Sequence, residues 1–265
     1  MSLIYETETE LLRRCFFDVQ NEVGLGRQER GYHQACALWL EQARVPFRSK
    51  PPHDLLLGGE VAHTLIPDFV AWDRITVEVK AVPRKLATAE FVQLFDYLKC
   101  RRDRIGLLVN MGLDRVHVER VIYDPPQYEL TEDWQYWTGH IAGRDREVGA
   151  EVRSALRAIY GAHQTGYGAE VIRKLILFEL QRRRLAHVVA PLAKAFFHGR
   201  EVDEAPLDCL VIEDRILLVY TSLFDCNQFN ISRGLSYMKG LGVAWGIAAN
   251  FGKKVAEFIG LRINA

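Results

Sequence analysis

The chain repeats itself in order, and this repeat limits the possible folds more than any other feature of its 265 residues. Four segments of the first half recur in the second half without a change of order, which chance matches would not preserve. We therefore expect a tandem duplication with one module over residues 1–124, a linker over 125–149 and a second module over 150–265. The matched segments are 23–26 with 165–168, 58–61 with 199–202, 68–75 with the one-residue-longer 208–216, and 97–112 with 237–252.

Two acids and a lysine lie close together on two predicted strands of the first module. Asp68 lies on one apolar run, and Glu78 and Lys80 lie on the next, with a tight turn at 73–74 between them. Strands joined by so short a turn are antiparallel neighbours, and alternate side chains share a face. Two carboxylates and an ammonium group on adjacent strands suit a divalent-metal phosphodiester hydrolase, because hard oxygen ligands hold Mg²⁺. The alternative is a solvated strand face that carries a Glu–Lys pair.

A helix is predicted from Glu29 to about Ala43, after a segment broken by two glycines. Glu29, Tyr32, Cys36 and Leu40 recur at helical spacing, which places Glu29 on or beside the face turned toward the core. A carboxylate there is costly unless it is paired or bound to a metal. The alternative is an ordinary glutamate in the first turn, where the helix dipole favours it.

Together these residues resemble the GxxExxY family of the PD-(D/E)xK nuclease-like superfamily. The resemblance covers roughly residues 8–123 and implies an α/β fold. With the repeat, it predicts two restriction-endonuclease-like modules, each a mixed β-sheet flanked by helices, that form an intramolecular pseudo-dimer. The motifs that carry it, in order, are Gly26-x-x-Glu29-x-x-Tyr32, Asp68, Glu78-Val79-Lys80, Gln93-x-x-x-Tyr97 and the strand 106–112.

The resemblance implies a magnesium or manganese site. Asp68 and Glu78 would be its carboxylate ligands, and the main-chain carbonyl of Val79 would be a third oxygen. Glu29 would hold a ligand water or a second metal ion, so it counts among both the metal ligands and the catalytic residues.

The same resemblance implies three further catalytic residues. Lys80 would position or polarise the attacking water and stabilise charge on the phosphate. Gln93 would orient water or phosphate, and Tyr97 would support it from one turn further along the same helix. His33 is expected to be a packing or surface residue, with an approach to the site as the alternative.

The second module has lost these residues. Val171 stands opposite Glu29, Arg233 stands opposite Gln93, and nothing replaces Glu78 or Lys80. Asp208 is expected to be the one retained acid, opposite Asp68. One acid does not hold a catalytic magnesium ion in water, so the second module is predicted to be inactive. As the partner in a pseudo-dimer, it would cover an apolar face or sheet edge that the first module alone would expose; the alternative is that it adds contacts to nucleic acid.

Clusters of arginine are the candidates for binding nucleic acid. Phosphate charge dominates nucleic-acid affinity, and such clusters could supply the opposite charge. The alternative is that basic groups near helix C-termini simply complement the helix dipole. A formal net charge of zero argues against a strong, constitutive DNA-binding protein. The clusters are Arg101, Arg102 and Arg104 in the first module and Arg182, Arg183 and Arg184 in the second.

The remaining composition indicates a globular protein of the cytoplasm. No apolar run is long enough to span a bilayer, and the first residues lack the basic and apolar regions of a secretory signal. Five cysteines occur without CxxC spacing, so we expect buried thiols in a reducing compartment and no iron–sulphur cluster. They are Cys15, Cys36, Cys100, Cys209 and Cys226.

The leading functional hypothesis is a Mg²⁺-dependent nuclease with DNA as the expected substrate. The alternative is a non-catalytic scaffold, derived from a nuclease fold, that binds nucleic acid or a protein. A small-molecule hydrolase or transferase lacks any supporting motif. The sequence leaves open exonucleolytic or endonucleolytic action, DNA or RNA as substrate, one metal ion or two, and whether two chains pair as a homodimer.

Overall fold

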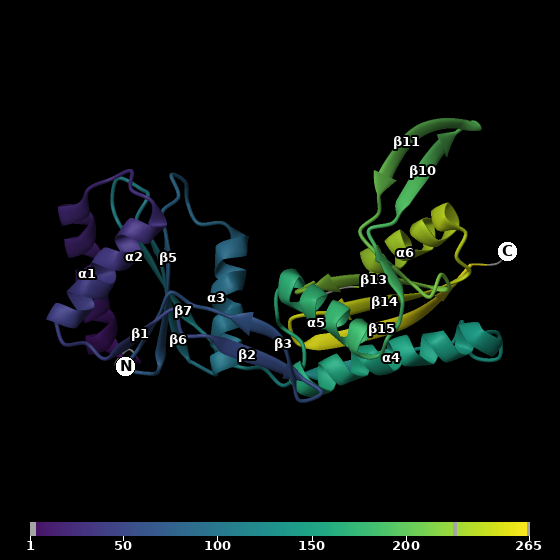
Figure 1. Cartoon of the computed structure of the whole chain (residues 1–265), viewed down its shortest axis with the longest axis horizontal. Coiled ribbons are helices and arrows are strands. Elements are labelled where there is room, and N and C mark those ends of the chain that lie inside the picture. Colours follow the sequence, from purple (N-terminus) through teal and green to yellow (C-terminus); the bar gives the residue numbers. More distant parts are fainter. Residues whose placement is uncertain (1–3, 225–226, 264–265) are drawn as a thin grey trace. The chain divides into compact units, whose positions relative to one another are not determined.

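The computed structural model describes residues 4–224 and 227–263 and divides the chain into two compact units. Unit 1 comprises Met1–Leu55 and Thr64–Pro125, and unit 2 comprises Leu56–His63 and Pro126–Ala265. Each unit is a mixed α/β structure, as expected (Figure 1). None of the helices in the described residues is both long and apolar enough to cross a membrane.

Unit 1 is built on a five-stranded mixed sheet in the order β1-β4-β5-β6-β7. Strands β5 and β6 are parallel and α3 connects them, whereas the other neighbours are antiparallel. A two-stranded hairpin, β2–β3, lies between β1 and β4 in the chain, and its middle part, Leu56–His63, belongs to unit 2. The elements are α1 (Glu6–Val23), α2 (Glu29–Gln42), β1 (Phe47–Ser49), β2 (His53–Leu57), β3 (Glu60–Leu65), β4 (Phe69–Ala71), β5 (Ile75–Lys80), α3 (Thr88–Arg101), β6 (Ile105–Asn110) and β7 (His117–Ile122).

The core of unit 1 fills the space between α1, α2 and one face of this sheet. Alternate residues of β5 (Ile75, Val77 and Val79) point into this core, as the period of two predicts. Helix α3 packs on β5 and β6 from the opposite side (Figure 1). The side chains of Thr76, Glu78 and Lys80 therefore lie on the α3 side of the sheet.

Unit 2 has the same order of elements on a six-stranded sheet, β8-β15-β14-β13-β12-β9. Strands β13 and β14 are again parallel and joined by a helix, and β8 adds to the far edge parallel to β15. A second hairpin, β10–β11, corresponds to β2–β3. The elements are β8 (Glu129–Asp133), α4 (Gly143–His163), α5 (Ala169–Arg182), β9 (His187–Val189), β10 (Leu192–Phe197), β11 (Arg200–Pro206), β12 (Leu210–Ile212), β13 (Ile216–Ser222), α6 (Gln228–Leu241), β14 (Trp245–Phe251) and β15 (Val255–Arg262).

The segment 125–149, expected to be a linker, carries secondary structure of unit 2. Strand β8 lies in it and pairs with β15, and α4 begins at Gly143. Trp137 anchors the segment, because its indole N–H donates to the carbonyl of Leu261 at 2.9 Å and its side chain is only 7% exposed. A stretch rich in aromatic residues is thus better explained by burial than by a flexible connection.

The turn between the two site strands is centred one residue earlier than expected. Trp72 and Asp73 have φ values of 48° and 54°, and the N–H of Arg74 donates to the carbonyl of Ala71 at 3.1 Å. Positive φ at both central residues matches the right-handed twist of a tight hairpin. Unit 2 repeats this turn at Glu213 and Asp214, with φ values of 52° and 54°.

The four cysteines within the described residues are free thiols. Cys15, Cys36 and Cys209 are buried as expected, whereas Cys100, near the C-terminal end of α3, is half-buried. Cys226 lies outside the described residues.

The loop after β5 depends on close packing against Gly112. A Cβ atom at Gly112 would lie 2.5 Å from the main-chain nitrogen of Val82, which no side chain tolerates without a backbone shift. We expect Gly112→Ala to lower the free energy of unfolding by about 1–3 kcal/mol, as measured by urea denaturation. The control is Gly31→Ala in α2, where the new Cβ would make an ordinary contact at 3.9 Å. That variant should be neutral or more stable by up to about 1 kcal/mol; equal stability of the two variants would contradict the prediction.

Candidate active site

Asp68 and Glu78 meet across two antiparallel strands of unit 1. Phe69 pairs with Val77 in the sheet, so Asp68 comes to lie beside Glu78. The N–H of Val79 donates to Asp68 Oδ2 at 2.9 Å, and the N–H of Asp68 lies 3.4 Å from Glu78 Oε2. The two residues are only 7% and 3% exposed. The alternative of a solvated strand face is therefore wrong.

Lys80 is the one lysine in direct contact with this carboxylate pair among the described residues. Its Nζ lies 2.7 Å from Glu78 Oε1, and the lysine side chain is 15% exposed. Burial, and then the charge of Asp68, raise the pKa of Glu78 to about 7 even though Lys80 opposes this shift. Burial alone would lower the pKa of Lys80, but the charge of Glu78, followed by those of Glu29 and Asp68, raises it.

The donor set fits a hard divalent cation. Asp68 and Glu78 bring two carboxylates into a buried place that Lys80 alone does not neutralise. A dication there would offset both the burial and the charge of Asp68, which together raise the pKa of Glu78. No group of three or more His, Cys, Asp and Glu side chains with the arrangement of a metal site occurs in residues 4–224 and 227–263. Two carboxylates and a main-chain oxygen match the coordination preference of Mg²⁺, which usually keeps several water ligands and binds substrate phosphate as a further ligand.

Glu29 differs from its predicted position. It is the first residue of α2 and is exposed, so it does not lie on the buried face. The buried face of α2 instead carries Tyr32, His33, Cys36 and Leu40. Because the charge of Glu29 raises the pKa of Lys80, the two groups are near each other, with Glu29 on the solvent side of the site.

Gln93 and Tyr97 lie one turn apart on α3, as the sequence predicts. The side-chain amide of Gln93 donates to the hydroxyl of Tyr97 at 2.8 Å. Burial, and then the charges of Glu78 and Asp68, raise the pKa of Tyr97 far above its ordinary value. The Tyr97 hydroxyl therefore lies in the electrostatic field of the carboxylate pair and stays protonated at any ordinary pH.

His33 belongs to the site more closely than its sequence context indicated. Its Nε2 lies 3.3 Å from the carbonyl oxygen of Asp68 and 3.8 Å from Asp68 Oδ1. Its ring stacks on Phe69 with centroids 4.3 Å apart, and the residue is 9% exposed. The sequence signal was its position one residue after Tyr32, at the boundary of the buried face of α2.

Asn110 holds the loop that follows Lys80, a role the sequence did not reveal. It pairs with Lys80 across parallel strands β5 and β6. Its side-chain amide donates to the carbonyls of Val82 at 3.1 Å and Arg84 at 2.8 Å, and its Oδ1 accepts from the N–H of Gly112 at 3.0 Å. Asn110 therefore fixes the path of the chain from β5 toward α3.

In unit 2, the added residue falls before β12, which changes the predicted counterpart of Asp68. Leu210 pairs with Leu218 as Phe69 pairs with Val77, so Cys209 takes the place of Asp68. Asp208 is not the retained acid that we expected: its side chain is 74% exposed and forms an ion pair with Arg233 at 2.9 Å.

The other site positions of unit 2 follow from the same sheet register. Thr221 pairs with Asn250 as Lys80 pairs with Asn110, so Val219 stands where Glu78 would be. Helix α5 begins at Ala169, which makes Ala169 the counterpart of Glu29 in place of the predicted Val171. The two-glycine match was out of phase by two residues, since α1 ends at Val23 and α4 ends at His163.

Three of the six candidate nucleic-acid-binding arginines are engaged inside their own unit. Arg101 is 7% exposed in its side chain and bonds Asp103 at 2.7 Å. Arg182 and Arg183 both bond Glu179, which is fully buried, at 2.7 Å. Those contacts indicate a structural role for these three, whereas the remaining ones, Arg102, Arg104 and Arg184, are exposed.

A family model described as PD-(D/E)XK nuclease superfamily matches residues 6–121. The match ends within β7 and so covers most of unit 1 and its carboxylate pair. No curated protein and no solved structure matches the chain at a significant level. The matched residues include Asp68, Glu78 and Lys80.

Proposed function

We propose that the protein is a Mg²⁺-dependent nuclease that cleaves DNA at a single centre in unit 1. The observation that carries this proposal is the buried pair of Asp68 and Glu78, with Lys80 in contact with Glu78. Burial, and then the charge of Asp68, raise the pKa of Glu78 to about 7. A fold has no structural need for such a pair, because burying two carboxylates side by side costs stability. The match to a nuclease superfamily supports the same function.

In this proposal Asp68, Glu78 and the carbonyl of Val79 hold the metal ion. The ion would supply a water of lowered pKa and would offset the charge that develops on the phosphate. The ammonium group of Lys80, held by Glu78 Oε1 at 2.7 Å, would orient the attacking water and stabilise negative charge on the phosphate oxygens.

Two groups on α3 and one on α2 complete the proposed site. The protonated hydroxyl of Tyr97 accepts from Gln93, so its own proton is directed away from that amide and can be donated to water or phosphate. Glu29, on the solvent side near Lys80, would bind a ligand water or a second metal ion.

We further propose that unit 2 arose by duplication of unit 1 and has become its inactive partner. The shared order of elements and strands supports this origin. In unit 2, Cys209 stands at the position of Asp68, Val219 at that of Glu78 and Thr221 at that of Lys80. Arg233 replaces Gln93. None of these side chains is a hard oxygen ligand of the carboxylate type, so unit 2 should not bind the metal ion.

Calorimetric titration with Mn²⁺ tests the proposal. We expect the wild type to bind Mn²⁺ and Asp68→Asn to weaken that binding by at least about tenfold, since a carboxylate ligand is lost. The matched control is Asp208→Asn, which removes the exposed acid at the aligned sequence position of unit 2 and should leave the affinity for Mn²⁺ unchanged. Labelled single-stranded and duplex DNA and RNA then identify the cleaved substrate.

A folded wild type that binds no Mn²⁺, even with an oligonucleotide present, would reject the nuclease and leave the non-catalytic scaffold. Equal loss of binding in Asp68→Asn and Asp208→Asn would reject the assignment of the site to unit 1.

A further inference from the structure

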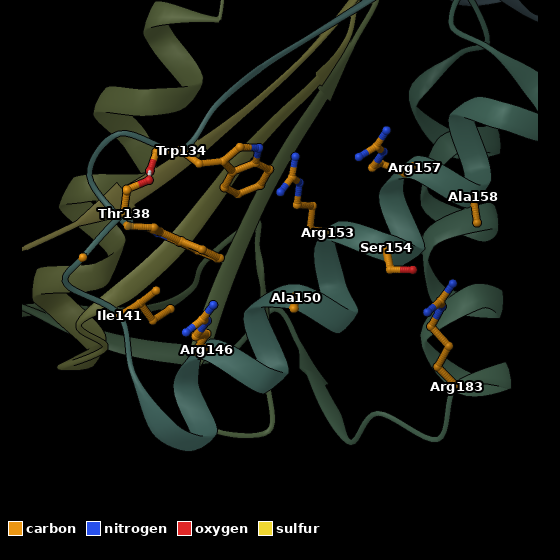
Figure 2. Close-up of a pocket in the computed structure, with 12 residues that line it drawn as sticks. Trp134, Thr138, Ile141, Arg146, Ala150, Arg153, Ser154, Arg157, Ala158 and Arg183 are labelled. Carbon is orange, nitrogen blue, oxygen red and sulfur yellow. Dashed lines mark hydrogen bonds between the residues drawn. The ribbon is translucent and has the colours of Figure 1, made fainter.

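One cavity within the described residues lies in unit 2, far along the chain from Asp68 and Glu78. It has a volume of about 1070 Å³ and runs between α4 and the segment 134–141. We call it the α4 groove (Figure 2). Arg146, Arg153 and Arg157 line it from α4, at spacings of seven and four residues that place them on one face of the helix. Smaller side chains, Ala150 and Ser154, lie between them and leave the groove open.

The groove is positively charged. Four arginines line it, Arg183 being the fourth, and no Asp or Glu does. The guanidinium of Arg153 donates to both carboxylate oxygens of Glu132, at 3.0 and 2.7 Å. Arg183 forms an ion pair with Glu151 at 2.9 Å. These two arginines are therefore held in place by partners outside the groove lining.

Arg146 and Arg157 retain free hydrogen-bonding capacity. Arg157 reaches the same Glu132 only at 3.6 Å, and its side chain is 56% exposed. Arg146 is exposed and has no carboxylate within ion-pair distance in the part of the chain that the structure describes. Each guanidinium carries five N–H donors, so the pair can bind anionic oxygens without giving up a buried partner.

The aromatic residues of the groove are not free to stack on bases. Trp137 is 7% exposed, and its indole N–H is engaged with the carbonyl of Leu261. The ring of Trp134 is covered by the guanidinium of Arg153, 4.8 Å from the ring centroid. Base stacking is the usual use of an open aromatic face in single-strand binding. The groove therefore suits phosphate contacts, which position a nucleic acid without reading its sequence.

Two of the three arginines on this face of α4, Arg146 and Arg157, are specific to unit 2. Helices α1 and α4 occupy the same place in their units and end 140 residues apart, at Val23 and His163. The counterparts of Arg146 and Arg157 in α1 are Glu6 and Phe17. Arg153 does have an arginine counterpart, Arg13, so it is only Arg146 and Arg157 that the fold shared by the two units does not explain.

We propose that the α4 groove binds the phosphate backbone of a nucleic acid and so makes unit 2 the substrate-holding half of the protein. This inference rests on the proposed nuclease function. From Arg146 to Arg157 the helix rises about 16 Å, which is the rise of about five nucleotides along one strand of a duplex.

The groove can be tested apart from the metal site by measuring, through fluorescence anisotropy in EDTA, the binding of a labelled DNA duplex of about 20 base pairs. We expect Arg146→Gln with Arg157→Gln to weaken binding uniformly across sequences and to reduce the slope of log K against log salt by about 2 between 50 and 200 mM salt. The charge-matched control is Arg13→Gln with Arg14→Gln on the corresponding helix α1. It should keep the wild-type slope. Both pairs are at the surface, so circular dichroism should show folded variants.

The two proposals fail separately. A groove variant that binds with the wild-type salt slope overturns the groove proposal, even if the enzyme cuts DNA. A control variant whose salt slope falls as much as that of the groove variant does the same. A wild type that binds no Mn²⁺ or cleaves no nucleic acid overturns the nuclease. If the groove variant still shows a reduced salt slope, the groove proposal stands.

Discussion

Replacing Lys80 by methionine should lower the rate of cleavage by at least about 100-fold while Mn²⁺ still binds. Methionine keeps much of the length of the side chain but removes the positive charge beside Glu78 Oε1. That charge is placed to orient water and to stabilise the phosphate as negative charge develops, which is an effect on kcat more than on substrate binding. Removing it also leaves Asp68 and Glu78 more negative, so affinity for a dication should be maintained or rise.

Single-turnover cleavage and calorimetry with Mn²⁺ separate these two effects. The control is Lys85→Met, five residues along the chain, where the lysine is exposed and outside the site. A Lys80→Met variant that cleaves at the wild-type rate would remove Lys80 from the mechanism. One that loses metal binding together with cleavage would assign Lys80 to building the site instead of to the reaction.

Replacing Glu78 by glutamine should abolish cleavage and yet raise stability at pH 8 in the absence of metal. Burial and the neighbouring Asp68 raise the pKa of Glu78 from its ordinary 4.5 to about 7. A shift of this size corresponds to about 3 kcal/mol of free energy, and the glutamine variant should recover a large part of it. Glutamine has the shape of the protonated acid and keeps a hydrogen bond for Lys80.

The direction of the pH dependence follows from this raised pKa. Between pH 4.5 and about 7 the folded protein holds a proton on Glu78 that the unfolded chain releases, so stability falls as pH rises through this window. Above pH 7 both states are ionised, and the contribution of Glu78 stays constant. The glutamine variant should lose this component of the pH dependence.

Urea unfolding of the wild type and of Glu78→Gln from pH 4.5 to 8, with and without Mg²⁺, measures the effect. Mg²⁺ should stabilise the wild type at pH 8 and leave Glu78→Gln unchanged, because the ion binds the folded carboxylate pair. Glu10→Gln on the exposed side of α1 is the control and should follow the wild type. A glutamine variant less stable than the wild type at pH 8 would show that the Glu78–Lys80 pair supports the fold instead of straining it.

Much of unit 1 could be predicted from its sequence because its signals are local. Helix α2 was predicted from Glu29 to about Ala43 and runs from Glu29 to Gln42, since spacing and a glycine break define a helix without reference to the rest of the chain. The alternation along β5 correctly placed Glu78 and Lys80 on one face. Antiparallel pairing across a short turn correctly brought Asp68 next to Glu78, although the turn itself is centred one residue earlier.

The residue of unit 2 that corresponds to Asp68 could not be predicted from the sequence, because one added residue shifts this part of the chain. Asp68 and Asp208 are the same residue type, which favours aligning them. The hydrogen-bonded register of the strands instead places Cys209 at the position of Asp68. The extra residue lies before β12, in a region whose turn and strand lengths the sequence does not fix. A shift of one position in a strand moves each side chain to the other face, so an aligned acid can become an exposed surface residue.

What the sequence by itself determined is which residues can carry chemistry: an acid, then a Glu-x-Lys on the next strand, and an amide and a phenol one turn apart on a helix. These depend on short-range geometry and residue type. The tertiary structure alone decided the raised pKa of Glu78, the place of His33 beside Asp68 and the exposure of Glu29. It also decided that Arg101, Arg182 and Arg183 are engaged in ion pairs. It also brought α4 together with the segment 134–141 to form an arginine-lined groove. Burial and electrostatic partners depend on residues distant in sequence, and a linear pattern does not specify which of them meet.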